Sequence, residues 1–119
     1  MKNNGIATSL LNIGRCHLIK KNYDSASKFL NDALETLFAF HESKDKDDFL
    51  SATIHYTLAR CLMENKEKRE LSKALIHADT SLQMRLRIFV DETHPNVVES
   101  NELVEKLKAA MATEKENAK

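Results

Sequence analysis

Apolar residues recur every three or four positions along most of this chain, the spacing that gives an α-helix one apolar face. Short polar segments interrupt the pattern, so that it divides the chain into separate stretches. The stretches cover about 5–20, 24–38, 48–65, 74–89 and 95–112. The pattern therefore predicts an all-α protein made of amphipathic helices, with no strands.

The interruptions mark where helices end. Two polar, highly charged stretches contain no apolar residue. We interpret 41–48 as a loop and 66–70 as a turn. Pro95 disfavours the α conformation at His94 and fits the first turn of a helix, so the last helix should begin at Pro95. That helix is polar on its outer side, as a capping helix is, and we expect 113–119 to fray.

Part of the first half of the chain is repeated. Residues 8–16 (TSLLNIGRC) and 53–61 (TIHYTLARC) align without gaps, 45 residues apart. A period of this length is typical of stacked helical hairpins, each with an apolar face that it cannot bury alone. We therefore expect one domain over 1–112, composed of a first helix pair at about 5–42, a second at about 48–92 and a capping helix at about 95–112.

Composition excludes several functions. Eighteen basic residues balance eighteen acidic ones in 119 residues, so no overall field favours nucleic acid or an anionic membrane. No apolar run approaches the roughly 20 residues of a membrane span, and the N-terminal residues are not those of a signal peptide. These features predict a soluble, cytoplasmic protein with no nucleic-acid partner and no membrane insertion.

Small residues and cysteines occupy matching places in the two units. Gly14 corresponds to Ala59, and Gly costs about 1 kcal/mol in a helix interior relative to Ala, which indicates close approach of a second helix. Cys16 corresponds to Cys61. Two cysteines at one register do not suggest a disulfide framework, and we expect each to be a small buried hydrophobe between helices.

Once both units are aligned, a longer motif appears. The first unit supplies Leu10, Ile13, Gly14, His17, Tyr23, Ala26, Leu30 and Ala33, and the second supplies Leu58, Ala59, Leu62, Ala74, Ala78 and Ser81. Over roughly 6–104 the chain resembles the tetratricopeptide repeat (TPR) family, and within it the kinesin-light-chain type, whose pattern of helix, His-Pro and new helix is similar to Leu82–Ile88 followed by His94–Val97. The resemblance implies antiparallel helix pairs stacked as a short right-handed superhelix, with a groove lined by the first helix of each pair. It also implies a role in protein–protein interaction.

If the small residues face their partner helices, helical spacing directs a different set of residues to the groove. The predicted peptide-binding residues are Leu11, Asn12, Arg15, Ile19, Tyr56, Thr57, Arg60 and Met63. Arg15 and Arg60 are equivalent, and together they would bind carboxylates, which favours a short acidic peptide from a protein partner. The alternative is that each arginine is solvated or paired with a neighbour such as Glu64, an interaction worth about 0–1 kcal/mol.

Metal binding and catalysis are weaker alternatives. Cys16 with His17, and Cys61 with His55, lack the spacing that brings ligands together on one helix face, so we predict no metal and no cofactor. The acidic segment 41–48 contains lysines and lacks the glycine of a calcium loop. No orienting group or oxyanion turn accompanies a cysteine–histidine pair, so we predict that the protein is not an enzyme.

Two functions remain. The first is an adaptor that holds a peptide segment of a partner in the groove. The second is a structural or self-assembly segment of a larger repeat protein, whose open apolar end drives homo-oligomerisation.

Overall fold

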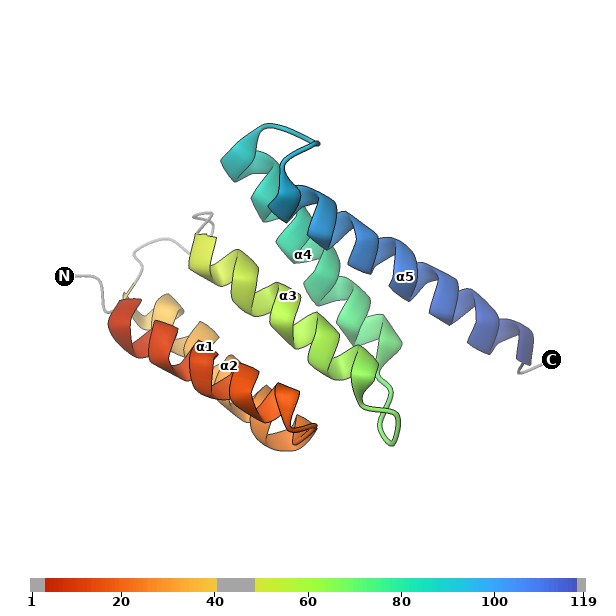
Figure 1. The fold of residues 1–119 in the computed structure, drawn as a ribbon, viewed down its shortest axis with the longest axis horizontal. Helices are drawn as coiled ribbons and strands as arrows, with labels where there is room; N and C mark the ends of the chain where they lie inside the picture. The colour runs from red at the N-terminus through yellow and green to blue at the C-terminus, as the bar shows by residue number, and fades with distance from the viewer. Residues whose placement is uncertain (1–3, 41–48, 118–119) are drawn as a thin grey trace.

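A computed structural model describes residues 4–40 and 49–117, and all of the regular structure in these ranges is helical (Figure 1). The helices are α1 (Asn4–Ile19), α2 (Tyr23–Phe40), α3 (Phe49–Glu64), α4 (Leu71–Phe89) and α5 (Pro95–Asn117). The prediction of an all-α protein is confirmed. The predicted loop at 41–48 lies outside the described residues.

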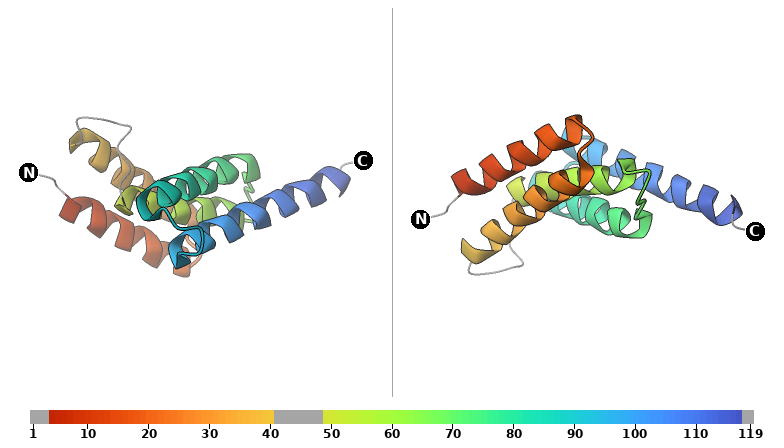
Figure 2. Two further views of the ribbon diagram at one scale, coloured as in Figure 1. Left: turned by 90° about the horizontal axis from the view of Figure 1, so that it is seen from above. Right: turned by 90° about the horizontal axis from the view of Figure 1, so that it is seen from below.

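Consecutive helices form two pairs. α1 packs along α2, and α3 packs along α4, each pair joined by a short connection that turns the chain back on itself (Figures 1 and 2). The second pair lies on the first mainly through α3 against α2, and α5 lies along α4 with a smaller contact to α3. α3 is therefore the helix that touches all of the others.

Two helices end at residues in the left-handed region. Lys21 follows α1 with φ 64°, and the N–H of Asn22 donates to the carbonyl of His17 at 2.8 Å, which closes the helix end. Val90 follows α4 with φ 51°, and its N–H donates to the carbonyl of Leu86 at 2.9 Å. Glycine usually fills such positions, so both connections are under some backbone strain.

α5 is longer than its sequence pattern predicts. It continues to Asn117 instead of fraying after Ala112. The segment 113–117 contains good helix formers and no Gly or Pro to end the helix. Glu114, in this extension, also pairs with Arg69 at 3.4 Å, which links α5 to the connection before α4.

The core has two parts that share α3. The first lies between α1, α2 and α3 and contains Ala7, Leu11, Leu18, Ala26, Leu30, Ala33, Leu34, Leu37, Ile54, Leu58 and Cys61. The second lies between α3, α4 and α5 and contains Ala59, Met63, Leu71, Ala74, Ala78, Leu82, Val97, Leu103, Val104 and Leu107. Opposite sides of α3 thus face the two halves of the molecule.

The predicted packing role of Gly14 is confirmed. A Cβ atom at this position would lie 2.8 Å from Cγ of Leu30 and 3.4 Å from the carbonyl oxygen of Ala26, both on α2. Ala59 is fully buried in the second part of the core. Small residues at these two places therefore do permit close approach of a second helix.

The prediction for the cysteines is right for one and wrong for the other. Cys61 is 1% exposed, with its sulfur 3.3 Å from the hydroxyl of Ser27 and 3.3 Å from the carbonyl of Tyr23. Cys16 is exposed. The cause is position in the stack: α2 covers Cys61 on α3, whereas no described helix lies on the matching side of α1.

Within the described ranges, no helix has the length and apolar character needed to cross a lipid bilayer.

Candidate functional site: a cleft between α3 and α5

The candidate site is an open cleft where α3 and α5 diverge after their contact. Its volume is about 490 Å³. α3 and α5 each contribute four lining residues: Tyr56, Arg60, Met63 and Glu64 from α3, and Glu99, Glu102, Leu103 and Lys106 from α5. The lining alternates charged groups with apolar surface, which suits an extended or helical peptide better than a small apolar ligand.

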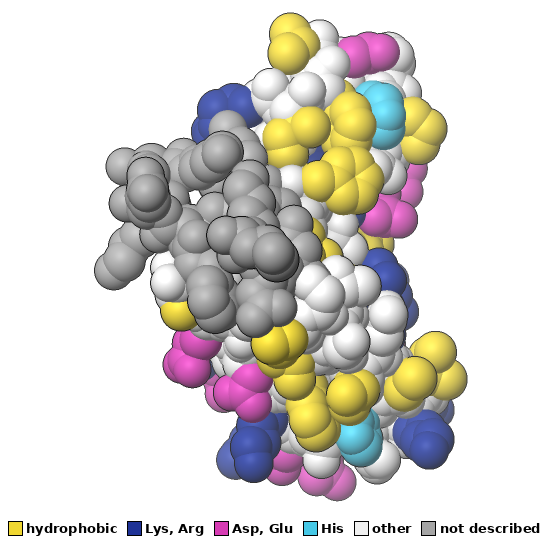
Figure 3. Space-filling view, turned by 90° about the vertical axis from the view of Figure 1, so that its left-hand side faces the viewer, with side chains coloured by type: hydrophobic (Ala, Val, Ile, Leu, Met, Phe, Trp, Pro, Cys, Tyr) yellow, Lys and Arg dark blue, Asp and Glu magenta, His cyan; other side chains and the backbone are white. Residues whose placement is uncertain are grey.

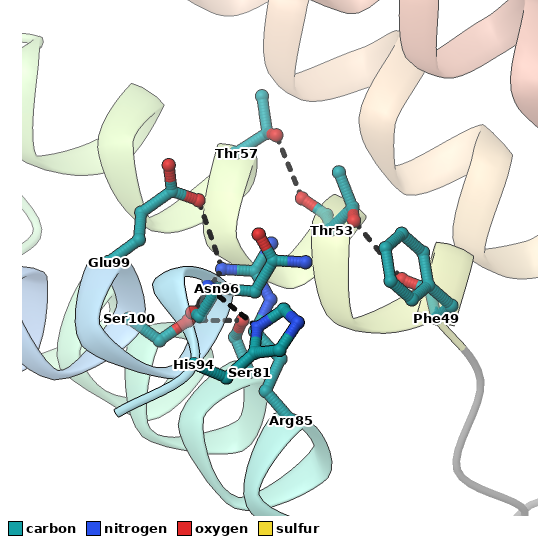
Figure 4. Close-up of polar contacts among 9 residues, drawn as sticks. All are labelled: Phe49, Thr53, Thr57, Ser81, Arg85, His94, Asn96, Glu99 and Ser100. Carbon is teal, nitrogen blue, oxygen red and sulfur yellow. Dashed lines mark hydrogen bonds and ion pairs between the residues drawn. The ribbon is translucent and has the colours of Figure 1, made fainter. Parts of the chain in front are cut away.

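A buried arginine lies at one end of this cleft. The side chain of Arg85, on α4, is 5% exposed, and its Nη1 lies 3.0 Å from Glu99 Oε1, 2.8 Å from Ser100 Oγ and 3.0 Å from the carbonyl oxygen of Asn96 (Figure 4). The same guanidinium lies 5.1 Å from the centre of the Tyr56 ring. One cation therefore fixes Tyr56 and Glu99 on opposite walls of the cleft.

Two serines complete the contact beneath Arg85. The hydroxyls of Ser81 on α4 and Ser100 on α5 lie 2.9 Å apart, and both side chains are fully buried. The hydrogen bond satisfies both groups, as buried hydroxyls require. It also holds α5 against α4 in one register, which sets the direction of the α5 wall.

The start of α5 is fixed by His94. Its Nδ1 accepts a hydrogen bond from the backbone N–H of Asn96 at 3.1 Å, and its ring stacks on Phe89 with the centroids 3.6 Å apart. Asp91 accepts bonds from the N–H and the hydroxyl of Thr93 within the same connection. The prediction that the last helix begins at Pro95 is confirmed.

Three of the predicted peptide-binding residues line the cleft, namely Tyr56, Arg60 and Met63. Nε of Arg60 also lies 3.1 Å from Glu64, in an ion pair between half-exposed side chains. The pairing that we considered as an alternative for Arg60 is thus present. A surface pair of this type is weak enough, at about 0–1 kcal/mol, for a ligand to displace it.

Two of the predicted residues are buried instead of facing a groove. Leu11 and Thr57 are each 3% exposed. Leu11 belongs to the first part of the core, and the hydroxyl of Thr57 donates to the carbonyl of Thr53 at 2.8 Å (Figure 4). The approach of α3 to the first helix pair covers positions that helical spacing alone leaves open, so neither side chain is accessible to a ligand.

The other three predicted residues, Asn12, Arg15 and Ile19, lie on the exposed surface of α1. None of them lines the cleft. A single groove lined by both α1 and α3 would require the two helix pairs to curve around one ligand. We expected Arg15 and Arg60 to lie in one groove. Of these two residues, the cleft contains only Arg60.

The sequence pattern did not identify the contact between Arg85 and Glu99. A signal was present, because Arg85 follows Ala78 and Leu82 at helical spacing and therefore lies on the buried side of α4. A charged residue at such a position needs a partner when it is buried. Finding that partner requires the geometry of the connection between α4 and α5.

The cleft carries more carboxylates than cations. Glu64, Glu99 and Glu102 face Arg60 and Lys106 among its lining residues. Burial raises the pKa of the Tyr56 hydroxyl, and the negative charge of Glu99 adds to the effect, so this phenol stays protonated and remains a hydrogen-bond donor.

Histidines and cysteines do not gather into a metal centre in the described part of the chain. No group of three or more His, Cys, Asp or Glu side chains there is placed to hold an ion. His55 pairs with His77, with their Nδ1 atoms 2.9 Å apart, and not with Cys61. Burial raises the pKa of the Cys61 thiol, which keeps it in the unreactive thiol form.

Compared with known proteins, the chain matches no protein-family model, no curated protein sequence and no solved structure.

Proposed function

We propose that this protein is a helical protein-interaction module that holds a peptide segment of a partner in the cleft between α3 and α5. The observation that carries the proposal is the Arg85 contact, which fixes the aromatic wall at Tyr56 and the acidic wall at Glu99 before any ligand arrives. A preorganised site loses less conformational entropy on binding than a flexible one. The succession of paired helices and a fifth helix supports assignment to the TPR class.

The charge of the cleft changes the ligand that we propose. The sequence favoured an acidic peptide because two arginines were expected in one groove. The cleft instead has three carboxylates: Glu64 and Glu99 are paired with Arg60 and Arg85, and Glu102 forms no ion pair within the described residues. We therefore propose a peptide with at least one Lys or Arg and an apolar residue that contacts Met63 or Leu103.

The experiment is a selection of peptides from a random displayed library on the purified chain, followed by titration of the selected peptides. Glu102→Lys reverses a charge on an exposed cleft residue without touching the core, and it should weaken binding about tenfold. Glu105→Lys makes the same change at an exposed position of α5 that does not line the cleft, and it is the matched control. Selected peptides that bind both variants like the unmodified chain would place the binding site elsewhere.

A further inference from the structure

A second surface of the molecule has the composition of an interface. On α1, Ile6 is 49% exposed and Ile13 is 41% exposed, and Ser9 and Cys16 are exposed beside them. We refer to these four residues as the outer face of α1. Hydrophobic side chains gather at the surface of the end of the molecule formed by α1 and α2, in the lower half of Figure 3.

The internal repeat shows what covers the same residues in the second unit. The positions equivalent to the outer face of α1 are Ser51, Ile54, Leu58 and Cys61 on α3, and each is 4% exposed or less. Ile54, Leu58 and Cys61 belong to the part of the core that α3 forms with α1 and α2, and Ser27 and Tyr23 of α2 contact Cys61 directly. The same four positions are thus buried in the second unit, where α2 lies on α3, and exposed in the first unit.

The charges in and next to α1 indicate which charge a helix packed on its outer face would carry. α1 contains Arg15 and no carboxylate, and Lys20 and Lys21 follow it directly. α2 itself carries three carboxylates, Asp24, Asp32 and Glu35, against the single cation of Lys28. A helix with the apolar stripe and the negative charge of α2 therefore complements α1 in both shape and charge.

We propose that the outer face of α1 is a docking surface for an acidic amphipathic helix that resembles α2. The partner helix would cover Ile13 and Cys16 as α2 covers Cys61, and it would place its carboxylates near Arg15, Lys20 and Lys21. This surface is separate from the cleft between α3 and α5, so the two proposals can fail independently.

The test uses a fluorescein-labelled peptide with the sequence of residues 22–40, titrated with the intact chain and followed by fluorescence anisotropy. Ile13→Asp should weaken binding about tenfold or more, because it places a carboxylate on the apolar centre of the surface. Ile76→Asp is the matched control, since Ile76 is a 67% exposed isoleucine on α4. It should leave the affinity within about twofold, as expected for an exposed site outside the contact.

A second measurement needs no variant of the protein. Cys16 is exposed and Cys61 is buried, so a maleimide should label Cys16 selectively in the folded chain. Bound peptide should slow this labelling. The same peptide with Leu34→Asp, two turns after Ser27 on the same side of α2, should neither bind nor protect Cys16.

Three results would overturn the proposal. The first is no binding at the highest soluble concentration of the chain. The second is peptide binding that Ile13→Asp does not weaken and that does not slow the labelling of Cys16, which would place the peptide elsewhere. The third is a concentration-dependent dimer of the chain alone that Ile13→Asp abolishes, which would make a second copy the occupant of this surface.

Discussion

The guanidinium of Arg85 lies 5.1 Å from the centre of the Tyr56 ring and donates a hydrogen bond to Glu99 at 3.0 Å, so one buried side chain joins α3, α4 and α5. The backbone carbonyl of Asn96 and the hydroxyl of Ser100 also accept from it. Its partners in the described part of the chain come from α3 and α5 and include one carboxylate, that of the half-exposed Glu99. The stability of this contact should therefore depend on the arginine more than on the acid.

Arg85→Ala should lower the free energy of unfolding by about 2–4 kcal/mol, because it leaves a cavity and removes several hydrogen bonds. Glu99→Gln keeps the shape and an acceptor oxygen at a half-exposed position, so it should cost about 1 kcal/mol or less. Urea unfolding followed by circular dichroism measures both. A larger loss for Glu99→Gln than for Arg85→Ala would show that charge neutralisation, and not packing, dominates the contact.

Gly14→Ala tests the contact between α1 and α2. The added methyl group would lie 2.8 Å from Cγ of the fully buried Leu30. Overpacking costs about 1–3 kcal/mol, against a gain of about 1 kcal/mol in helix propensity, so we expect a net loss of about 1 kcal/mol.

Two further variants separate these terms. Gly5→Ala adds a methyl group to the same helix with no atom within 4 Å apart from its chain neighbours and the nearby helix backbone, so it should be neutral or slightly stabilising. In a Leu30→Ala background the steric contact is gone, and Gly14→Ala should become stabilising. A loss of equal size in both backgrounds would mean that Leu30 is not the cause.

Local pattern predicted the helices and much of the core, because helical periodicity depends on neighbours in the sequence. It could not predict which side of α1 would be covered. Cys16 and Cys61 share one register, yet only Cys61 has another helix against it. The cleft was half predicted for a similar reason. Tyr56, Arg60 and Met63 follow from the face of α3, but Glu99 and Glu102 depend on how the connection after Val90 directs α5.

Val90→Gly should stabilise the protein. Val90 has φ 51°, a conformation that is costly for a β-branched residue, and its side chain is 83% exposed, so little buried area is lost. We expect a gain of about 1 kcal/mol in the free energy of unfolding after the greater flexibility of glycine in the unfolded chain is included. Val90→Ala retains a Cβ atom in the same conformation and is the control. Equal effects of the two substitutions would argue against backbone strain as the cause.

The paired histidines of α3 and α4 should make stability depend on pH. Burial, with a smaller contribution from the charge of His77, lowers the pKa of His55 from 6.5 to about 4, and burial also lowers the pKa of His77. The unfolded chain therefore binds protons more readily than the folded chain between about pH 6.5 and pH 4. The stability that comes from neutral His55 is complete above this range and is lost as the pH falls through it.

Lowering the pH from 7.5 to 4.5 should cost about 2 kcal/mol through His55 alone, which urea unfolding at a series of pH values measures. His55→Gln removes the titrating group and keeps a side chain that can hydrogen-bond to His77. Carboxylates and other histidines contribute to both proteins, so the difference between the two pH profiles isolates His55. The variant should lose less stability than the unmodified chain over this range, with a residual slope from His77. Parallel profiles would show that His55 titrates alike in the folded and unfolded chains, and that its contact with His77 at 2.9 Å does not require the neutral form.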